Sequence, residues 1–375
     1  MAIARLAFAA SEHNSDMYYL SGFLAPDPFA WFKIRGRTGV VLSPLELDRG
    51  RRTARVHHVF SNLALRAEFK SVSFRKPSHA ALLAFLFKRR GVRSVEVPRS
   101  FPLGLAEDLR REGLRVAPVK GAFVPERARK TPEEVRAIAD AIRRTEKVLG
   151  MVIRRLARTR IRKGRLWEGG RVLTSEAVKA GIAEAFLRAG MRVVEDTIVA
   201  CGDDACEPHN RGAGPLRADT AIILDIFPRS ETTRYHADIT RTVVRGTASP
   251  ELKRMYAAVA AAQRAALRKI RAGRNGADAN TAACDCFKAW GFETGEENGR
   301  QQGFIHSTGH GLGLDVHDGG PGLFPGAGRL PAGAVVTVEP GLYYPGVGAV
   351  RLEDDVVVTK TGCRVLSRFP KVLEI

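Results

Sequence analysis

Two hairpins of this chain each carry two acidic residues at the ends of apolar strands, and this arrangement constrains the fold more than any other feature. Asp225 ends a run of buried-type apolar residues, and Asp238 leads the next strand thirteen residues later. The pattern recurs where Glu339 ends a second apolar run and Glu353 follows fourteen residues later, after a turn rich in proline and glycine. Unpaired buried charges are costly, so these carboxylates need cations or protons to hold them together. The recurrence also suggests an internal pseudo-duplication.

A histidine-rich segment supplies the nitrogen ligand that such a site needs. His306, His310 and His317 lie within one glycine-rich stretch. Oxygen-rich ligation with one imidazole suits a pair of divalent ions such as Mn²⁺, Zn²⁺ or Co²⁺. Such pairs activate water for attack on a carbonyl and polarise the same carbonyl. Each residue alone is more often a solvated turn residue or a satisfied polar group, so the prediction of a metal hydrolase depends on their joint occurrence.

The length of the chain and one helix-start signal predict two domains. At 375 residues the chain is longer than a usual single domain. Short strands and helices alternate over residues 1–125, which is typical of an α/β domain. Thr131 as N-cap, Pro132 at the first helical position and two acids in the first turn then open a long helix. We therefore expect domains at 1–128 and 129–375. The helices expected in the second domain span residues 131 to about 160, 175–189, 250–271 and 279–290.

The basic charge of the chain is concentrated in its first third. Residues 1–130 hold 24 Lys and Arg against 11 Asp and Glu, whereas residues 131–375 hold 36 against 29. In that first third the basic residues occur as scattered pairs without interleaved exposed aromatic residues or a recognition motif, which indicates a solvated surface and argues against a nucleic-acid partner.

Hydropathy and cysteine content constrain the location of the protein. A charged residue interrupts every apolar run, so we expect no membrane-spanning helix and no membrane partner. The first ten residues lack the apolar core of a secretion signal and are interpreted as the first strand of the fold. Five cysteines with C-x4-C and C-x-C spacing predict reduced thiols in a cytoplasm and not a zinc ribbon or disulfide framework.

Taken together, the motifs closely resemble those of the pita-bread metallopeptidases, the group of aminopeptidase P, prolidase, creatinase and methionine aminopeptidase. In the first domain Tyr18-Tyr19-Leu20-Ser21-Gly22-Phe23 resembles the creatinase-type N-terminal domain, which points to the Xaa-Pro branch. The motifs of the second domain are Leu224-Asp225, Asp238-Ile239-Thr240-Arg241-Thr242, Gly309-His310-Gly311-Leu312-Gly313-Leu314-Asp315-Val316-His317-Asp318, Val338-Glu339-Pro340-Gly341-Leu342-Tyr343 and Arg351-Leu352-Glu353-Asp354.

The resemblance implies a set of metal ligands. Asp225 would chelate one ion, Asp238 and Glu353 would bridge two ions, and His310 with Glu339 would complete the second position. It also implies a creatinase-like α/β N-terminal domain at 1–128, an α+β pita-bread catalytic domain at 129–375, and a homodimer. Two divalent ions per chain are expected, with manganese favoured over zinc or cobalt.

Other roles also follow from the resemblance. Glu339 would act as the proton shuttle for the attacking water, and His317 would donate to the developing oxyanion. His209 matches a family histidine on the leaving-group side, and His306 an additional histidine of the Xaa-Pro branch. Arg351 matches an arginine beside the bridging glutamate, and with His306 it is predicted to contact substrate.

The activity implied is hydrolysis of the bond between an N-terminal residue and proline, by an Xaa-Pro aminopeptidase or an Xaa-Pro dipeptidase. The alternatives are a pita-bread enzyme with other chemistry, such as a metal-dependent lyase or small-amide hydrolase, and an inactive module that binds protein or nucleic acid. The chain departs from the family pattern at Phe227, where relatives usually have glycine, and its first hairpin is about two residues longer. A phenylalanine beside the site would reshape the substrate pocket.

Overall fold

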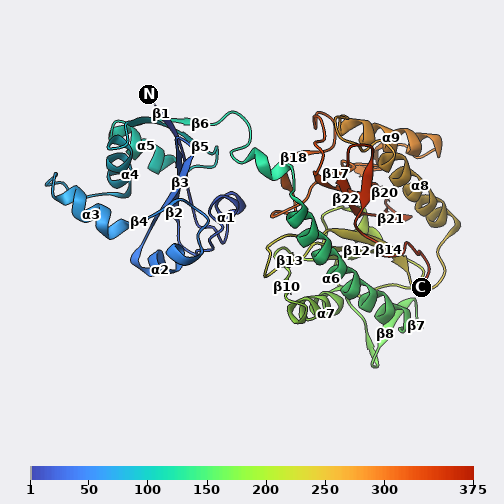
Figure 1. Cartoon of the computed structure of the whole chain (residues 1–375). Helices are drawn as coiled ribbons and strands as arrows, with labels where there is room; N and C mark the ends of the chain where they lie inside the picture. Colours follow the sequence, from blue (N-terminus) through green and yellow to red (C-terminus); the bar gives the residue numbers. More distant parts are fainter. Residues whose placement is uncertain (1) are drawn as a thin grey trace. The chain divides into compact units, whose positions relative to one another are not determined.

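A computed structural model describes residues 2–375, which divide into two compact units. The units are Met1–Pro125 and Glu126–Ile375, coloured from blue to teal and from green to red in Figure 1. The division lies three residues before the boundary expected near residue 128. No helix among the described residues is both long enough and apolar enough to cross a membrane.

The N-terminal unit is built on one six-stranded sheet with helices around it (Figure 1). The strand order is β4-β3-β2-β1-β5-β6, and β1 pairs antiparallel with β2 and parallel with β5. The strands are β1 (Ala2–Ala9), β2 (Phe29–Ile34), β3 (Arg37–Leu42), β4 (His58–Ser61), β5 (Val92–Val97) and β6 (Arg115–Pro118). The helices are α1 (Ser15–Ser21), α2 (Pro44–Thr53), α3 (Asn62–Lys70), α4 (His79–Lys88) and α5 (Leu103–Arg111). The predicted α/β character of this part is confirmed.

Four long helices of the C-terminal unit enclose its strands. They are α6 (Pro132–Ala157), α7 (Ser175–Arg188), α8 (Pro250–Leu267) and α9 (Ala277–Ala289), and all four lie where helices were predicted. Thr131 caps α6 in a full capping box with Glu134, so the local sequence determines where this helix begins.

The strands of the C-terminal unit form several small sheets. The two that matter most here are the three-stranded sheet β11-β12-β14 and the five-stranded sheet β18-β17-β19-β22-β23. The first consists of β11 (Ile198–Cys201), β12 (Ala221–Ile226) and β14 (Ile239–Val244), and the second of β17 (Gly309–Gly311), β18 (Asp318–Leu323), β19 (Val335–Val338), β22 (Asp354–Val358) and β23 (Cys363–Val365). The other pairs are β10 (Met191–Arg192) with β13 (Arg229–Ser230), β15 (Gly295–Glu297) with β16 (Arg300–Gln302), and β20 (Gly341–Tyr344) with β21 (Gly348–Arg351).

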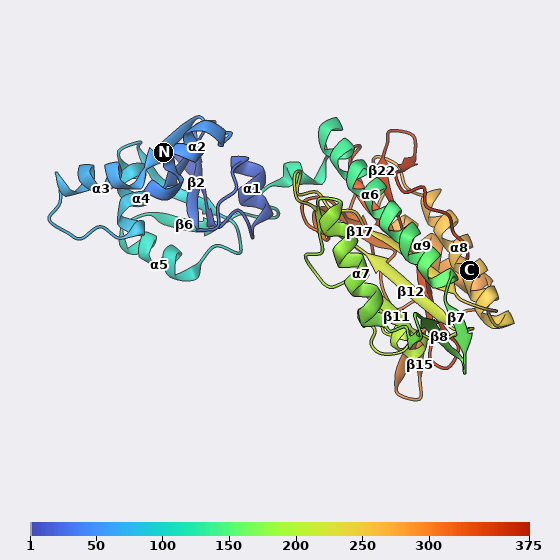
Figure 2. The same ribbon diagram turned by 90° about the horizontal axis from the view of Figure 1, so that it is seen from below.

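The helices pack on these sheets in two pairs. α6 and α7 contact the sheet of β11, β12 and β14, and Figure 2 shows β12 running beside both helices. α8 and α9 pack against each other and against β18 to β21. The strands between the two helix pairs are almost wholly buried, so any polar group on them must be paired inside the protein or bind a ligand.

Candidate metal centre

The first pair of predicted acids lies where β12 and β14 meet. Every residue of β12 is buried, and its register places Asp225 opposite Thr240 on β14. Asp238 precedes β14 by one residue, so the two carboxylates lie diagonally across the same pair of strands. Their exposed fractions are only 8% and 4%.

The second pair of acids lies at one end of β19 and β22. These strands are antiparallel with Val338 opposite Asp354, so Glu339, which follows β19, and Glu353, which precedes β22, emerge at the same end. The backbone N–H of Glu353 donates to the carbonyl of Thr240 over 3.1 Å and so connects this end to β14. The two acidic hairpins thereby meet at one buried point.

His310 completes the cluster. Ligand atoms of Asp238, His310 and Glu353 all lie within 4.8 Å of one another. His310 Nε2 is 3.6 Å from Asp238 Oδ2 and 3.3 Å from Glu339 Oε1. The other ring nitrogen, Nδ1, lies 3.2 Å from the carbonyl oxygen of Gly311, to which it can donate. That hydrogen bond leaves Nε2 facing the carboxylates as the available ligand atom.

The electrostatics of the cluster favour an added positive charge. Burial, and then the neighbouring carboxylates, raise the pKa values of Asp238 and Glu353 well above their ordinary values. Burial raises the pKa of Glu339 to about 7, although Arg351 opposes the shift. Burial also lowers the pKa of His310, which keeps its imidazole neutral. The carboxyl groups resist ionisation because no positive charge lies among them. A bound cation would supply that charge and stabilise the carboxylates, and the neutral imidazole could bind it as a ligand.

Unpartnered oxygens provide an independent test of whether cations fit. Asp225 Oδ1, Glu353 Oε1 and Asp355 Oδ1 are buried and have no hydrogen-bond donor among the described residues. Buried carboxylate oxygens are normally paired, and such groups call for an explanation. Two of the three belong to predicted ligands, so the residues present fit divalent cations.

Hydroxyl groups orient two of the acids. Thr240 Oγ1 donates to Glu353 Oε2 over 2.7 Å, and Thr337 Oγ1 donates to Glu339 Oε1 over 3.2 Å. Asp355 Oδ2 accepts the backbone N–H of Asp238 over 3.1 Å. No role was predicted from the sequence for Thr240, Thr337 or Asp355. The available signal was that each lies two positions from a predicted ligand.

Arg351 lies against Asp225. Its Nη2 is 2.6 Å from Asp225 Oδ2, and its Nη1 donates to the hydroxyl of Tyr343 over 2.7 Å. His306 Nε2 lies 2.8 Å from the same hydroxyl, and burial lowers the pKa of His306 to about 3. Arg351 is only 3% exposed, so its pair with Asp225 lies inside the protein. Its contact with Glu353 is indirect, because Arg351 Nε lies 3.4 Å from the Thr240 hydroxyl that donates to Glu353.

The other two predicted histidines, His209 and His317, are exposed. His317 is exposed, and its ring centroid is 4.1 Å from that of His310. Burial of the ring lowers the pKa of His317, and His310 and His209 lower it further. His209 is also exposed and adds to the lowered pKa of His306.

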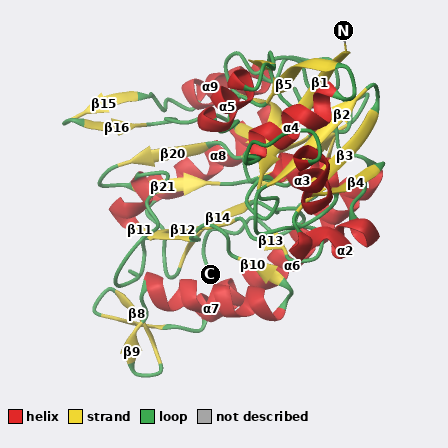
Figure 3. Cartoon of the chain, turned by 90° about the vertical axis from the view of Figure 1, so that its left-hand side faces the viewer, coloured by secondary structure: helices red, strands yellow, loops and turns green. Residues whose placement is uncertain are grey.

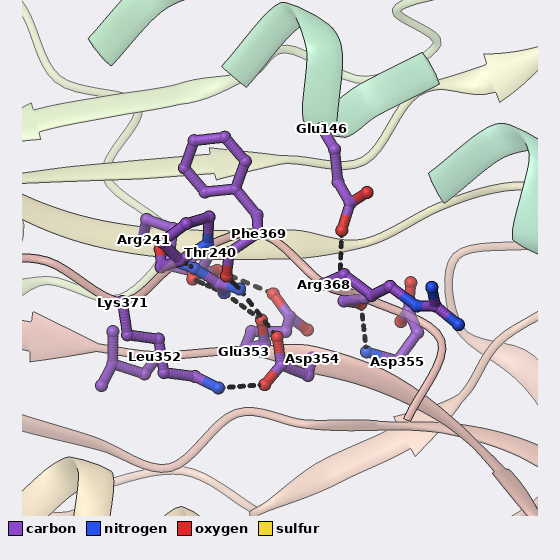
Figure 4. Close-up of polar contacts among 12 residues, drawn as sticks. Glu146, Thr240, Arg241, Leu352, Glu353, Asp354, Asp355, Arg368, Phe369 and Lys371 are labelled. Atoms are coloured by element: carbon purple, nitrogen blue, oxygen red, sulfur yellow. Dashed lines mark hydrogen bonds and ion pairs between the residues drawn. The ribbon is translucent and has the colours of Figure 1, made fainter. Parts of the chain in front are cut away.

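A buried ion network supports the strands behind the carboxylates (Figure 4). Arg241, 1% exposed, donates to the carbonyls of Thr240 and Glu353 and pairs with Asp354 Oδ1 at 2.8 Å. Lys371 pairs with the other oxygen of Asp354. Because one guanidinium binds the backbone of both strands, it fixes the spacing between Asp238 and Glu353.

A second ion cluster anchors the loop that carries His317. Asp318 is 6% exposed and pairs with Arg127 and, at 3.0 Å, with Lys130 Nζ. Arg127 Nη2 also pairs with Asp315 at 2.6 Å. The two cations come from the segment that leads into α6, so this segment holds the loop on both sides of His317.

Comparison with known proteins identifies a family and a fold. The sequence profile of metallopeptidase family M24 matches residues 136–360. An uncharacterized peptidase of Bacillus subtilis, YqhT, is 40% identical over 182 residues, which are 48% of this chain and 48% of that protein. The chain thus matches about half the length of such curated relatives.

Two solved structures share the fold over the whole chain. An Xaa-Pro dipeptidase from Bacillus anthracis superposes with a TM-score of 0.83 at 23% identity, covering 100% of this chain and 95% of that one. An X-Pro aminopeptidase from Thermotoga maritima superposes with a TM-score of 0.80 at 22% identity, covering 99% and 97%. The predicted pita-bread architecture, with an α/β unit before an α+β unit, is confirmed.

Proposed function

We propose that this chain, which belongs to metallopeptidase family M24, is a metal-dependent peptidase that cleaves the bond between an N-terminal residue and proline. The observation that carries the proposal is the cluster of Asp238, Glu353 and His310, with Glu339 3.3 Å from His310 and unpartnered oxygens on Asp225 and Glu353. We assign this activity to residues 129–375, as a pita-bread catalytic domain, and interpret residues 1–128 as a creatinase-like domain.

Two divalent ions, with Mn²⁺ favoured, are the proposed cofactor. Asp225 would hold one ion, His310 and Glu339 the other, and Asp238 and Glu353 would lie between them. Ions bound there supply an activated water and polarise the carbonyl that is attacked. Oxygen-rich ligation with one imidazole supports Mn²⁺ over a site built for Zn²⁺ alone.

Glu339 is proposed to accept the proton that water releases. In the metal-free protein burial raises its pKa to about 7, so this carboxyl can exchange a proton near neutral pH. The Thr337 hydroxyl donates to its Oε1, which restricts the carboxylate to one orientation. The same oxygen lies 3.3 Å from His310 Nε2, so Glu339 is held beside the other metal ligands while it exchanges the proton.

Two histidines are proposed to act on the substrate. His317 is exposed next to His310 and can donate to the oxygen of the attacked carbonyl, where negative charge develops. His209 is placed to contact the leaving-group side. Because Arg351 is buried against Asp225, we now propose a positioning role for it in place of the predicted substrate contact.

The preference for proline is supported by the resemblance of the first domain to that of the Xaa-Pro branch and by the chemistry of the bond. The bond before proline is a tertiary amide that has no N–H, so a dedicated peptidase is chemically reasonable. The shared fold accommodates both an Xaa-Pro dipeptidase and an X-Pro aminopeptidase, so the choice between dipeptide and longer substrate needs an assay.

A peptide panel tests this function. Protein loaded with Mn²⁺ is incubated with matched Xaa-Pro and Xaa-Ala dipeptides and with Xaa-Pro-Zaa tripeptides, and the products are read by mass. We expect release of Xaa from the proline peptides only, abolished by a chelator and by Glu339→Gln. Cleavage of Xaa-Ala at the same rate, or no cleavage of any proline peptide with metal bound, would contradict the proposal.

A further inference from the structure

A small basic sheet in the C-terminal unit has no part in the proposed chemistry. It consists of β7 (Arg160–Arg162), β8 (Arg165–Glu168) and β9 (Arg171–Val172), and it projects beyond α7 in Figures 1 and 3. Residues 154–171 hold eight Lys and Arg and a single acid. The rest of 126–375 is nearly balanced, with 31 basic and 29 acidic residues. The excess charge of this unit is thus concentrated on this sheet and the end of α6.

The strand register places several of the charges on one face. Arg160 lies opposite Trp167, and Arg162 lies opposite Arg165. Directly opposed residues of an antiparallel pair point to the same side, so three arginines and one tryptophan share a face. Like charges placed opposite each other are destabilising, which makes the arrangement costly unless an anion binds it.

The turn of this hairpin adds a further charge. Lys163 and Gly164 form the tip, both with positive φ, at 50° and 68°. Hairpin tips of this kind favour Asn or Gly, because other side chains are strained at positive φ. A lysine therefore occupies this position against the local backbone preference.

Most of these cations have no acidic partner. Arg155 is neutralised by Glu168, with its Nη2 2.6 Å from Oε2. Among residues 2–375, six of these cations are in no ion pair within 4.0 Å, namely Arg158, Arg160, Arg162, Lys163, Arg165 and Arg171. The arginines at the end of α6 can stabilise the C-terminus of that helix, but this effect is confined to its last turn and does not extend to the sheet.

A hollow lies beside the aromatic residue. It has a volume of about 400 Å³, and its lining includes Arg158, Arg160, Arg162 and Trp167, together with the paired Arg155 and Glu168. The Trp167 indole Nε1 donates to the carbonyl of Arg162 over 3.3 Å, which orients the ring. The hollow thus combines arginine side chains with a half-buried, oriented aromatic ring.

We propose that this face binds single-stranded nucleic acid. A base stacks on Trp167, and successive phosphates contact Arg160, Arg162 and Arg165. Arg160 and Arg162 are two residues apart on one strand, about 6–7 Å, so they can contact different points along an extended backbone. A base can stack on an aromatic ring only when it is unpaired, which favours a single strand over a duplex. A polyphosphate without bases would make no use of the tryptophan.

The test uses the full chain and a fluorescein-labelled single-stranded oligonucleotide of mixed sequence, followed by anisotropy at several salt concentrations. Single-strand binding weakens with salt with a slope of about −0.7 for each phosphate contact. We expect Arg160→Glu, Arg162→Glu and Arg165→Glu combined to weaken binding at least 10-fold and to reduce the slope by about 2. Trp167→Ala should weaken binding about 10-fold, and Trp167→Phe should restore most of it.

A matched control separates this face from general basicity. Lys269, Arg271 and Lys360 are exposed, are in no ion pair among the described residues, and are changed to Glu together, with the same change in net charge. This control should bind within about threefold of the parent, and circular dichroism should show that both triple variants are folded.

Several results would overturn the proposal. The first is an equal loss of oligonucleotide affinity in the control variant, and the second is an unchanged affinity in Trp167→Ala. The third is displacement of the oligonucleotide by inorganic polyphosphate, or by a duplex of the same length, as effectively as by unlabelled single strand. The fourth is binding to anionic vesicles without binding to the oligonucleotide.

Discussion

Replacing Thr240 by valine tests how the chain orients a proposed bridging carboxylate. The Thr240 hydroxyl donates to Glu353 Oε2 over 2.7 Å, and Glu353 Oε1 has no other donor among the described residues. Both residues are almost fully buried, so no bulk water replaces the lost hydroxyl. Thr240→Val therefore leaves both oxygens of the Glu353 carboxylate without a hydrogen-bond donor in the metal-free state.

The expected magnitude follows from the type of hydrogen bond. A bond to an ionised group contributes about 1.5–3 kcal/mol. Glu353 must be ionised to bind a cation, so this loss appears in metal affinity, as about 10- to 100-fold weaker binding. Titration with Mn²⁺ in competition with a fluorescent chelator measures the change. Turnover at saturating Mn²⁺ should change less than the affinity.

Thr242→Val is the matched control on the same strand. The Thr242 hydroxyl donates to the carbonyl of Arg351 over 2.9 Å and accepts its N–H over 3.0 Å, and it contacts no proposed ligand. This variant should lose stability, by about 1–3 kcal/mol, but keep its metal affinity. If Thr240→Val binds Mn²⁺ as the parent does, or if both variants lose affinity equally, the reasoning is wrong.

Three further predictions concern other parts of the site. His310→Ala should lose metal and the metal-dependent rise in Tm, whereas His317→Ala should keep both and lose about 10²- to 10³-fold in kcat. Elemental analysis and turnover measurements on both variants would show whether the two roles are reversed. In chelated protein, the raised pKa values of Asp238, Glu339 and Glu353 mean that the folded state holds protons that the unfolded state has lost. The stability of chelated protein should therefore fall as the pH rises from about 4, the ordinary carboxyl pKa, to at least about 7, the folded-state pKa of Glu339, and the stability of Mn²⁺-loaded protein should not; a flat profile of Tm against pH for chelated protein would contradict this. Asp318→Ala leaves Arg127 and Lys130 without their shared partner and should lower the free energy of unfolding, measured by urea titration, by about 3–5 kcal/mol. A loss below about 1 kcal/mol would show that Asp318 does not anchor the His317 loop.

The acids could be predicted from sequence because their pattern is local, whereas His310 was chosen among three histidines through the resemblance of its motif to the family. Asp225 and Glu339 each end an apolar run, and a charge in that position needs a partner wherever the strand lies. Likewise, Thr131 and the acids after it specify the start of α6 without any tertiary contact.

The supporting contacts could not be predicted because they depend on the register of strands that are far apart in sequence. The Arg351–Asp225 pair joins residues 126 positions apart, and the Thr240–Glu353 bond joins residues 113 apart. The β7–β9 sheet was missed for another reason. Its strands are rich in arginine and only two to four residues long, too short for the alternation of apolar and polar residues that indicates a strand, so only the structure reveals it.

The number of metal ions per chain tests the central claim most directly. Protein freed of metal with a chelator, reconstituted with excess Mn²⁺ and passed through a desalting column is measured by elemental analysis. Four carboxylates and one imidazole are too many ligands for one Zn²⁺ and too acidic to remain together without positive charge, so we predict a ratio close to two. A ratio that saturates at one or at zero would contradict the dinuclear site.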